Sequence, residues 1–190
     1  MVIVLLMPGL YSPVMNATRT AWMTAGVFLL GLSIGALARG KAFDPSLYHG
    51  KPNLEAGKAL LELARIQAED GSWENIAVGR VYYVAGMKSQ GQAIFNAATS
   101  RKDDAGDWIR MGRAFYDAKD WGKAFVAFDR ALQMKPNDAA WLAEVGAYNN
   151  VRGNRAKAEA LFDRSFQQNP GEVWNTVNMA GSYLGVEPLR

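Results

Sequence analysis

The chain has 190 residues, of which 49% are hydrophobic and 21% are charged, a balance typical of a folded protein. The chain has 21 lysine and arginine residues and 18 aspartate and glutamate residues. This small net charge gives no reason to expect a nucleic-acid partner. The sequence contains no cysteine, which excludes disulfides, thiolate nucleophiles and thiolate metal sites.

An uncharged stretch of nineteen residues lies between Arg19 and Arg39. As a helix it would be roughly 28 Å long, close to the hydrocarbon thickness of a bilayer. No polar face runs along it, so we expect a segment directed to a membrane rather than a helix buried in a core.

The fate of this segment has two interpretations. Ala36 and Ala38 are small residues at the positions that a signal peptidase reads, which predicts a signal peptide over residues 1–39 and a periplasmic mature protein. Alternatively, residues 20–38 are retained as a single anchor in an inner membrane, with the rest of the chain facing the periplasm. Gly31 and Gly35 have the spacing at which two membrane helices can pair, which would permit a homo-oligomer.

Residues 40–53 are predicted to form a linker. Two prolines, Pro45 and Pro52, disfavour helix in the residues before them, and Gly50 adds flexibility. His49, the only histidine of the sequence, lies here without a cysteine or a second histidine to complete a metal site. We therefore expect neither a metal site nor general-base chemistry from it.

A pattern of large and small residues repeats across residues 106–168. Its landmarks are first Trp108, Met111, Gly112, Phe115, Ala124, Phe128, Ala131 and Pro136, and 34 residues later Leu142, Val145, Gly146, Asn149, Ala158, Phe162, Ser165 and Pro170. The small residues would let two antiparallel helices approach, and the large ones would fill the space around the crossing. A fixed repeat of this length predicts helical hairpins that bury their apolar faces against one another.

These landmarks resemble two tetratricopeptide repeats, over residues 105–138 and 139–172. A divergent unit precedes them at about 72–104, in which Val78, Gly79, Tyr82, Gly91, Phe95 and Ala98 hold the same relative positions. Residues 54–68 predict a helix with Gly57, Leu61 and Ala64 at second-helix positions, and residues 173–185 predict a cap helix. The resemblance implies an all-α domain at residues 54–190, a right-handed superhelical stack of about three antiparallel hairpins with a flanking helix at each end.

The resemblance also implies a concave groove, lined by the first helix of each unit, that takes a peptide or an extended segment of a protein. Carried onto this sequence, the groove positions are Trp73, Ile76, Arg80, Tyr83, Ile109, Arg113, Tyr116, Asp117, Ala143, Ala147, Asn150, Trp174 and Asn178.

One pair of groove residues recurs in consecutive units. Arg80 and Tyr83 of the first unit correspond to Arg113 and Tyr116 of the second, and each pair lies three residues apart on one helical face. We expect these residues to be exposed and to form a cationic and aromatic wall, suited to an acidic or carboxylate-ending segment. The alternative is that the arginines pair with carboxylates inside the array.

No catalytic or phosphate-binding motif occurs in the sequence, so we expect no enzyme, no cofactor and no nucleic-acid partner. The expected function is a protein–protein interaction scaffold of a bacterial envelope, exported or membrane-tethered, that acts through its groove as an adaptor in the assembly or traffic of a complex. The alternative is a membrane-anchored structural accessory subunit of a larger membrane complex.

Overall fold

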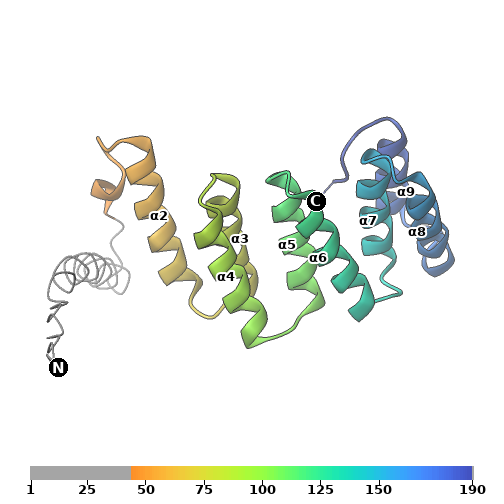
Figure 1. The fold of residues 1–190 in the computed structure, drawn as a ribbon, viewed down its shortest axis with the longest axis horizontal. Coiled ribbons are helices and arrows are strands. Elements are labelled where there is room, and N and C mark those ends of the chain that lie inside the picture. Colours follow the sequence, from red (N-terminus) through yellow and green to blue (C-terminus); the bar gives the residue numbers. More distant parts are fainter. Residues whose placement is uncertain (1–43, 190) are drawn as a thin grey trace, which may run out of the picture. The chain divides into compact units, whose positions relative to one another are not determined.

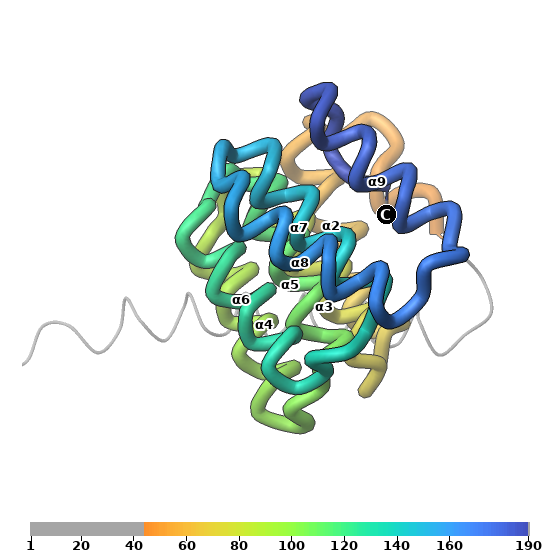
Figure 2. Tube along the Cα trace, turned by 90° about the vertical axis from the view of Figure 1, so that its right-hand side faces the viewer, coloured from red at the N-terminus to blue at the C-terminus, as the bar shows by residue number. Residues whose placement is uncertain are grey.

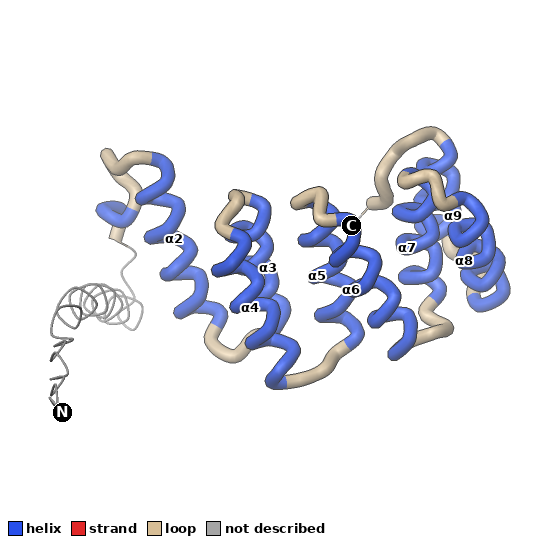
Figure 3. The backbone as a smooth tube through the Cα atoms, in the orientation of Figure 1, coloured by secondary structure: helices blue, strands red, loops and turns tan. Residues whose placement is uncertain are grey.

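The computed structural model describes residues 44–189, so the expected signal or anchor segment at residues 1–39 lies outside the described part of the chain. The described residues form α-helices and one short 3-10 helix, and no strand occurs among them (Figure 3). The fold is all-α, as the repeat pattern predicts. The elements are η1 (Pro45–Leu47), α2 (Asn53–Ala68), α3 (Ser72–Val84), α4 (Lys88–Arg101), α5 (Ala105–Asp117), α6 (Trp121–Met134), α7 (Ala139–Val151), α8 (Arg155–Gln168) and α9 (Val173–Tyr183).

The chain divides into two units, with the boundary between residues 67 and 68. The second unit contains three consecutive antiparallel helix pairs, α3 with α4, α5 with α6 and α7 with α8, and α9 packs on α7 (Figure 1). Figures 1 and 2 show α4 and α6 on one side of this array and the first helices α3 and α5 on the other. The prediction of stacked hairpins is therefore confirmed.

An acidic residue caps three of the first helices at intervals of 34 residues. Asp104 accepts a hydrogen bond from the Gly106 amide at the start of α5, at 2.8 Å, and Asp138 accepts one from the Trp141 amide of α7, at 3.0 Å. Glu172 does the same at the start of α9. Each cap satisfies an amide that the helix itself leaves without a partner, and each carboxylate lies at the positive end of the helix dipole.

A glycine on the first helix and a phenylalanine on the second make the crossing of each hairpin. Phe95 lies on Gly79, Phe128 on Gly112 and Phe162 on Gly146. A Cβ atom at any of the three glycines would come within 3.0 Å of that ring, a distance that packed side chains do not tolerate. These glycines are therefore needed for the close approach of the two helices.

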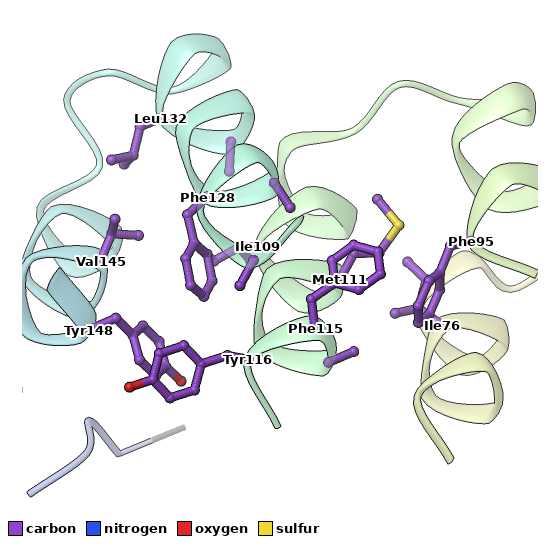
Figure 4. Close-up of a cluster of buried hydrophobic side chains, with 14 of the residues drawn as sticks. Ile76, Phe95, Ile109, Met111, Phe115, Tyr116, Phe128, Leu132, Val145 and Tyr148 are labelled. Atoms are coloured by element: carbon purple, nitrogen blue, oxygen red, sulfur yellow. The ribbon is translucent and has the colours of Figure 1, made fainter. Parts of the chain in front are cut away.

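Aromatic side chains fill the space between consecutive hairpins. Phe128 of α6 stacks on Tyr148 of α7, with the ring centroids 5.0 Å apart, and Tyr148 also meets Tyr116 of α5 at 4.3 Å (Figure 4). All three side chains are buried. The core is thus continuous from one hairpin to the next, as expected when each unit buries its apolar surface on its neighbours.

The first unit contains η1 and α2. Asp44 begins η1 by accepting hydrogen bonds from the amide and the hydroxyl of Ser46, and the hydroxyl bond, which is the largest cause, lowers the pKa of its carboxyl. None of the helices in residues 44–189 is long and apolar enough to cross a membrane.

Candidate functional site

A hollow of about 290 Å³ lies between the first helices α3 and α5. Its floor includes Ile76, which is buried, and one of its walls is the exposed ring of Trp73. Three arginines complete the lining, together with Ala77: Arg80 from α3, and Arg110 and Arg113 from α5. Apolar surface and guanidinium groups are therefore combined within one small site.

Each of the three arginines is held by a carboxylate. Arg80 Nε donates to Asp117 Oδ2 at 2.6 Å, which ties α3 to α5. Arg113 binds Glu144 through two parallel hydrogen bonds of 2.6 Å, which tie α5 to α7. Arg110 lies one turn after Asp107, with 3.6 Å between its NH1 and Oδ1 of that carboxylate.

The pairing orients the arginines because the acids are buried and the bases are not. The side chains of Asp107, Asp117 and Glu144 are 2%, 10% and 6% exposed, whereas those of Arg110, Arg80 and Arg113 are 44%, 46% and 26% exposed. A guanidinium has five N–H donors in a planar fork, and a bidentate bond to a carboxylate uses only two of them. The charges balance locally, so attraction to an anion should act at short range rather than steer it from a distance.

The arrangement corrects the prediction about the tyrosines. Tyr83 and Tyr116 were expected on the exposed wall of the groove, but both are buried. The reason is that the next first helix covers this flank: Tyr83 meets Phe115 of α5, and Tyr116 meets Tyr148 of α7. The expected aromatic part of the wall is therefore wrong, and Trp73 is the aromatic side chain that lines the hollow.

Tyr83 takes part in a polar cluster on the second-helix side of the array. Its hydroxyl donates to Asp120 Oδ2 at 2.8 Å and accepts from Lys123 Nζ at 3.0 Å. Burial raises the pKa of the Tyr83 hydroxyl, and the hydrogen bond from Lys123 opposes the rise. This tyrosine links α3 to the start of α6 and is not available to a ligand in the groove.

The arginine part of the prediction has a mixed outcome. Arg80 and Arg113 do lie together at one hollow, as their echo in the sequence predicts. They also pair with carboxylates inside the array, which was the alternative interpretation, and that alternative is confirmed. The two are compatible because the carboxylates are buried while the arginine side chains keep part of their surface exposed.

The remaining predicted groove residues do not join this hollow. Ile109, Ala143 and Ala147 are buried in the core, and Asn150 donates to the Ser182 hydroxyl of α9 at 3.0 Å. Trp174 is exposed on α9. Asn178 accepts from the amide of Leu189 at 2.8 Å, so the segment after α9 turns back along that helix (Figure 1).

Two residues of the hollow, Ala77 and Arg110, were not predicted. They are counterparts, since each lies three residues before the arginine of its unit, Arg80 or Arg113. The sequence could have indicated them, because residues three apart share a helical face and each of the two lies three residues before a repeated arginine.

Comparison with known proteins gives two distant relatives. The chain is 27% identical over 144 residues to human "Protein O-mannosyl-transferase TMTC1" and 23% identical over 116 residues to the mouse protein of that name. These matches cover 72% and 60% of this chain, but only 16% and 12% of the relatives. No family model matches the chain, and no solved structure matches it.

The hairpin architecture, the 34-residue pattern and these distant matches agree on one description. The chain is a tetratricopeptide-like helical-repeat protein. The matches reach a small part of the two relatives, so they support the fold of this tetratricopeptide-like array and not the transfer of mannose.

Proposed function

We propose that this tetratricopeptide-like protein is a binding scaffold whose arginine-lined hollow takes an acidic side chain or carboxylate of an extended partner segment. The observation that carries the proposal is the convergence of Arg80, Arg110 and Arg113 on an apolar floor beside the exposed Trp73. Arginine and tryptophan are enriched among the residues that dominate binding energy at protein interfaces.

The energetics require both parts of the hollow. Two charge-assisted hydrogen bonds contribute about 3 to 6 kcal/mol in total, whereas a micromolar complex needs about 8 kcal/mol. Contact with Trp73 and Ile76 must supply the remainder. We therefore propose that the partner places an apolar residue next to its carboxylate.

A selection from a random peptide library, displayed against the full chain, tests this function. We expect enrichment of peptides in which aspartate, glutamate or a terminal carboxylate neighbours an apolar residue. Arg110→Gln should abolish the enrichment because it removes one charge and leaves the Arg80 and Arg113 pairs in place. Arg155→Gln is the matched control, since Arg155 is an exposed, ion-paired arginine on α8. Selection of peptides without acidic residues, or equal enrichment with Arg110→Gln, would rule the proposal out.

For the cellular setting we propose an adaptor of a bacterial envelope that assembles or moves an envelope complex, with the array in the periplasm. The signal-like features of residues 1–39 support export. The alternative, a membrane-anchored accessory subunit, is supported by the length of the uncharged stretch at residues 20–38. Amino-terminal sequencing of the purified protein separates the two, because a mature chain that begins at Arg39 is incompatible with a retained anchor.

A further inference from the structure

The helix α9 is a first helix that exposes the face on which a second helix packs in the other hairpins. Its buried residues Asn175, Met179 and Ser182 lie on the opposite face, towards α7. Ala180 is exposed, although Gly146, its counterpart in α7, is covered by Phe162 of α8. Among the described residues, no second helix covers this face of α9.

The helix α2, in contrast, carries the residue pattern of a second helix. Gly57, Leu61 and Ala64 have the spacing that Gly91, Phe95 and Ala98 have in the second helix α4, each 34 residues earlier. A Cβ atom at Gly91 would lie 2.7 Å from the carbonyl oxygen of Gly79 on α3. At Gly57 a Cβ atom would meet no described atom within 4 Å. Gly57 is exposed and Leu61 and Ala64 are half-buried, whereas Gly91, Phe95 and Ala98 are all buried, so within the described part of the chain this face of α2 is less covered than its counterpart on α4.

The residue types at the two open faces complement each other. In each of the three complete hairpins, a phenylalanine of the second helix packs on a glycine of the first helix. A Cβ atom on that glycine would collide with the phenylalanine ring. On α9 the glycine position is Ala180, which carries a Cβ atom, and on α2 the phenylalanine position is Leu61, which is smaller. The added methyl group on one face is matched by the smaller side chain on the other, and such volume-conserving exchanges are tolerated in packed cores.

We propose that a second copy of the chain covers α9 with its α2, so that the two half-hairpins form one complete hairpin between copies. This contact would pair a first helix with a second helix, as α7 pairs with α8 within one chain. It is heterologous, since each copy offers α2 at one end and α9 at the other, and such contacts produce head-to-tail chains or closed rings. This association does not depend on the arginine-lined hollow.

Cross-linking of introduced cysteines tests the contact directly, because the natural sequence has no cysteine. Leu61→Cys and Ala180→Cys are prepared as separate full-length variants of different mass and mixed under mild oxidation. We expect a covalent dimer that contains one copy of each variant. Val126→Cys replaces an exposed apolar residue of α6 and is the matched control in place of Ala180→Cys. Equal yields from the two mixtures would overturn the proposal.

Sedimentation of the full chain over a range of concentrations gives an independent test. The mass of the unmodified protein should rise with concentration. Leu61→Phe should weaken association by about tenfold or more, because its ring meets the Ala180 methyl group. Adding Ala180→Gly should restore association by recreating the glycine–phenylalanine pair, with circular dichroism verifying that helicity is unchanged.

Two outcomes of sedimentation would contradict the proposal. One is a protein that stays monomeric at every concentration, which would leave α9 to a different occupant, such as a partner's helix. The other is an association that neither variant changes, which would place it on another surface, such as the paired segments at residues 20–38.

Discussion

At the scale of single residues, the glycine of each first helix sets how closely its hairpin can close. Gly112→Ala would place a methyl group against the Phe128 ring, which is itself buried and has no room to move. We expect a loss of about 1 to 3 kcal/mol in the free energy of unfolding, measured by urea denaturation. Gly122→Ala is the control, because a Cβ atom there meets nothing within 4 Å. It should leave stability equal or slightly raised, and a loss equal to that of Gly112→Ala would contradict the explanation.

The ion pair between Arg113 and Glu144 gives a second prediction at this scale. Arg113→Ala leaves a buried carboxylate without its bidentate partner, so we expect a loss of about 2 to 3 kcal/mol, moderated by the partial exposure of the pair. Arg113→Ala combined with Glu144→Ala should lose less than the sum of the two single changes in a double-mutant cycle. Additive losses would show that the two side chains do not interact energetically.

The same residues show how far the site could be predicted from sequence. The arginines were found because their recurrence in consecutive units is a local pattern, visible without the neighbouring helices. The burial of Tyr83 and Tyr116 could not be found in this way, because it depends on the angle at which the next hairpin packs, and a single repeat does not encode that angle. Arg110 was not predicted because its counterpart in the first unit is Ala77, so no charged residue recurs at this position.

At the scale of elements, α5 depends on its amino-terminal cap. The hydrogen bond from the Gly106 amide, the largest cause, lowers the pKa of the Asp104 carboxyl in the folded state. Asp104→Ala should lower the free energy of unfolding by about 1 kcal/mol at neutral pH. Thermal unfolding monitored by circular dichroism measures the change.

The same cap predicts a pH dependence. Because the pKa is lower in the folded than in the unfolded chain, the stabilisation is complete above about pH 4 and is lost as the pH falls through the folded-state value. Asp104→Asn is the control, since an asparagine can still cap the helix but does not titrate. It should keep most of the stability at neutral pH and flatten the acid side of the profile. An unchanged acid profile would show that other carboxylates determine it.

The helices themselves were predicted well because their signals are local. The hairpin crossings follow from the spacing of small and large residues, which a single repeat already shows. The end of α9 was less accurate: a cap helix to residue 185 was expected, and the helix ends at Tyr183, before the left-handed Gly185. A glycine at that position ends a helix at little conformational cost, and no part of the repeat pattern specifies it.

At the scale of the whole molecule, the array should be least stable where its hairpins lack neighbours. The fully buried side chains concentrate in α5, α6 and α7, whereas α9 packs on α7 and exposes its other face. In a stacked array each unit is stabilised by its own packing and by the units next to it, so a terminal helix has fewer stabilising contacts. In dilute solution we therefore expect backbone amides to exchange with deuterium most slowly in α5 to α7 and considerably faster in α9.

Mass spectrometry of peptides from the exchanged full chain measures this gradient, and concentration provides its internal control. If copies associate head to tail, a rise in protein concentration should slow exchange in α2 and α9 and leave α5 to α7 unchanged, because only the two open faces gain a neighbour. Amides of α9 that exchange as slowly as those of α5 in dilute solution would contradict the stability gradient. A concentration effect spread evenly over the array would instead indicate aggregation without a defined contact.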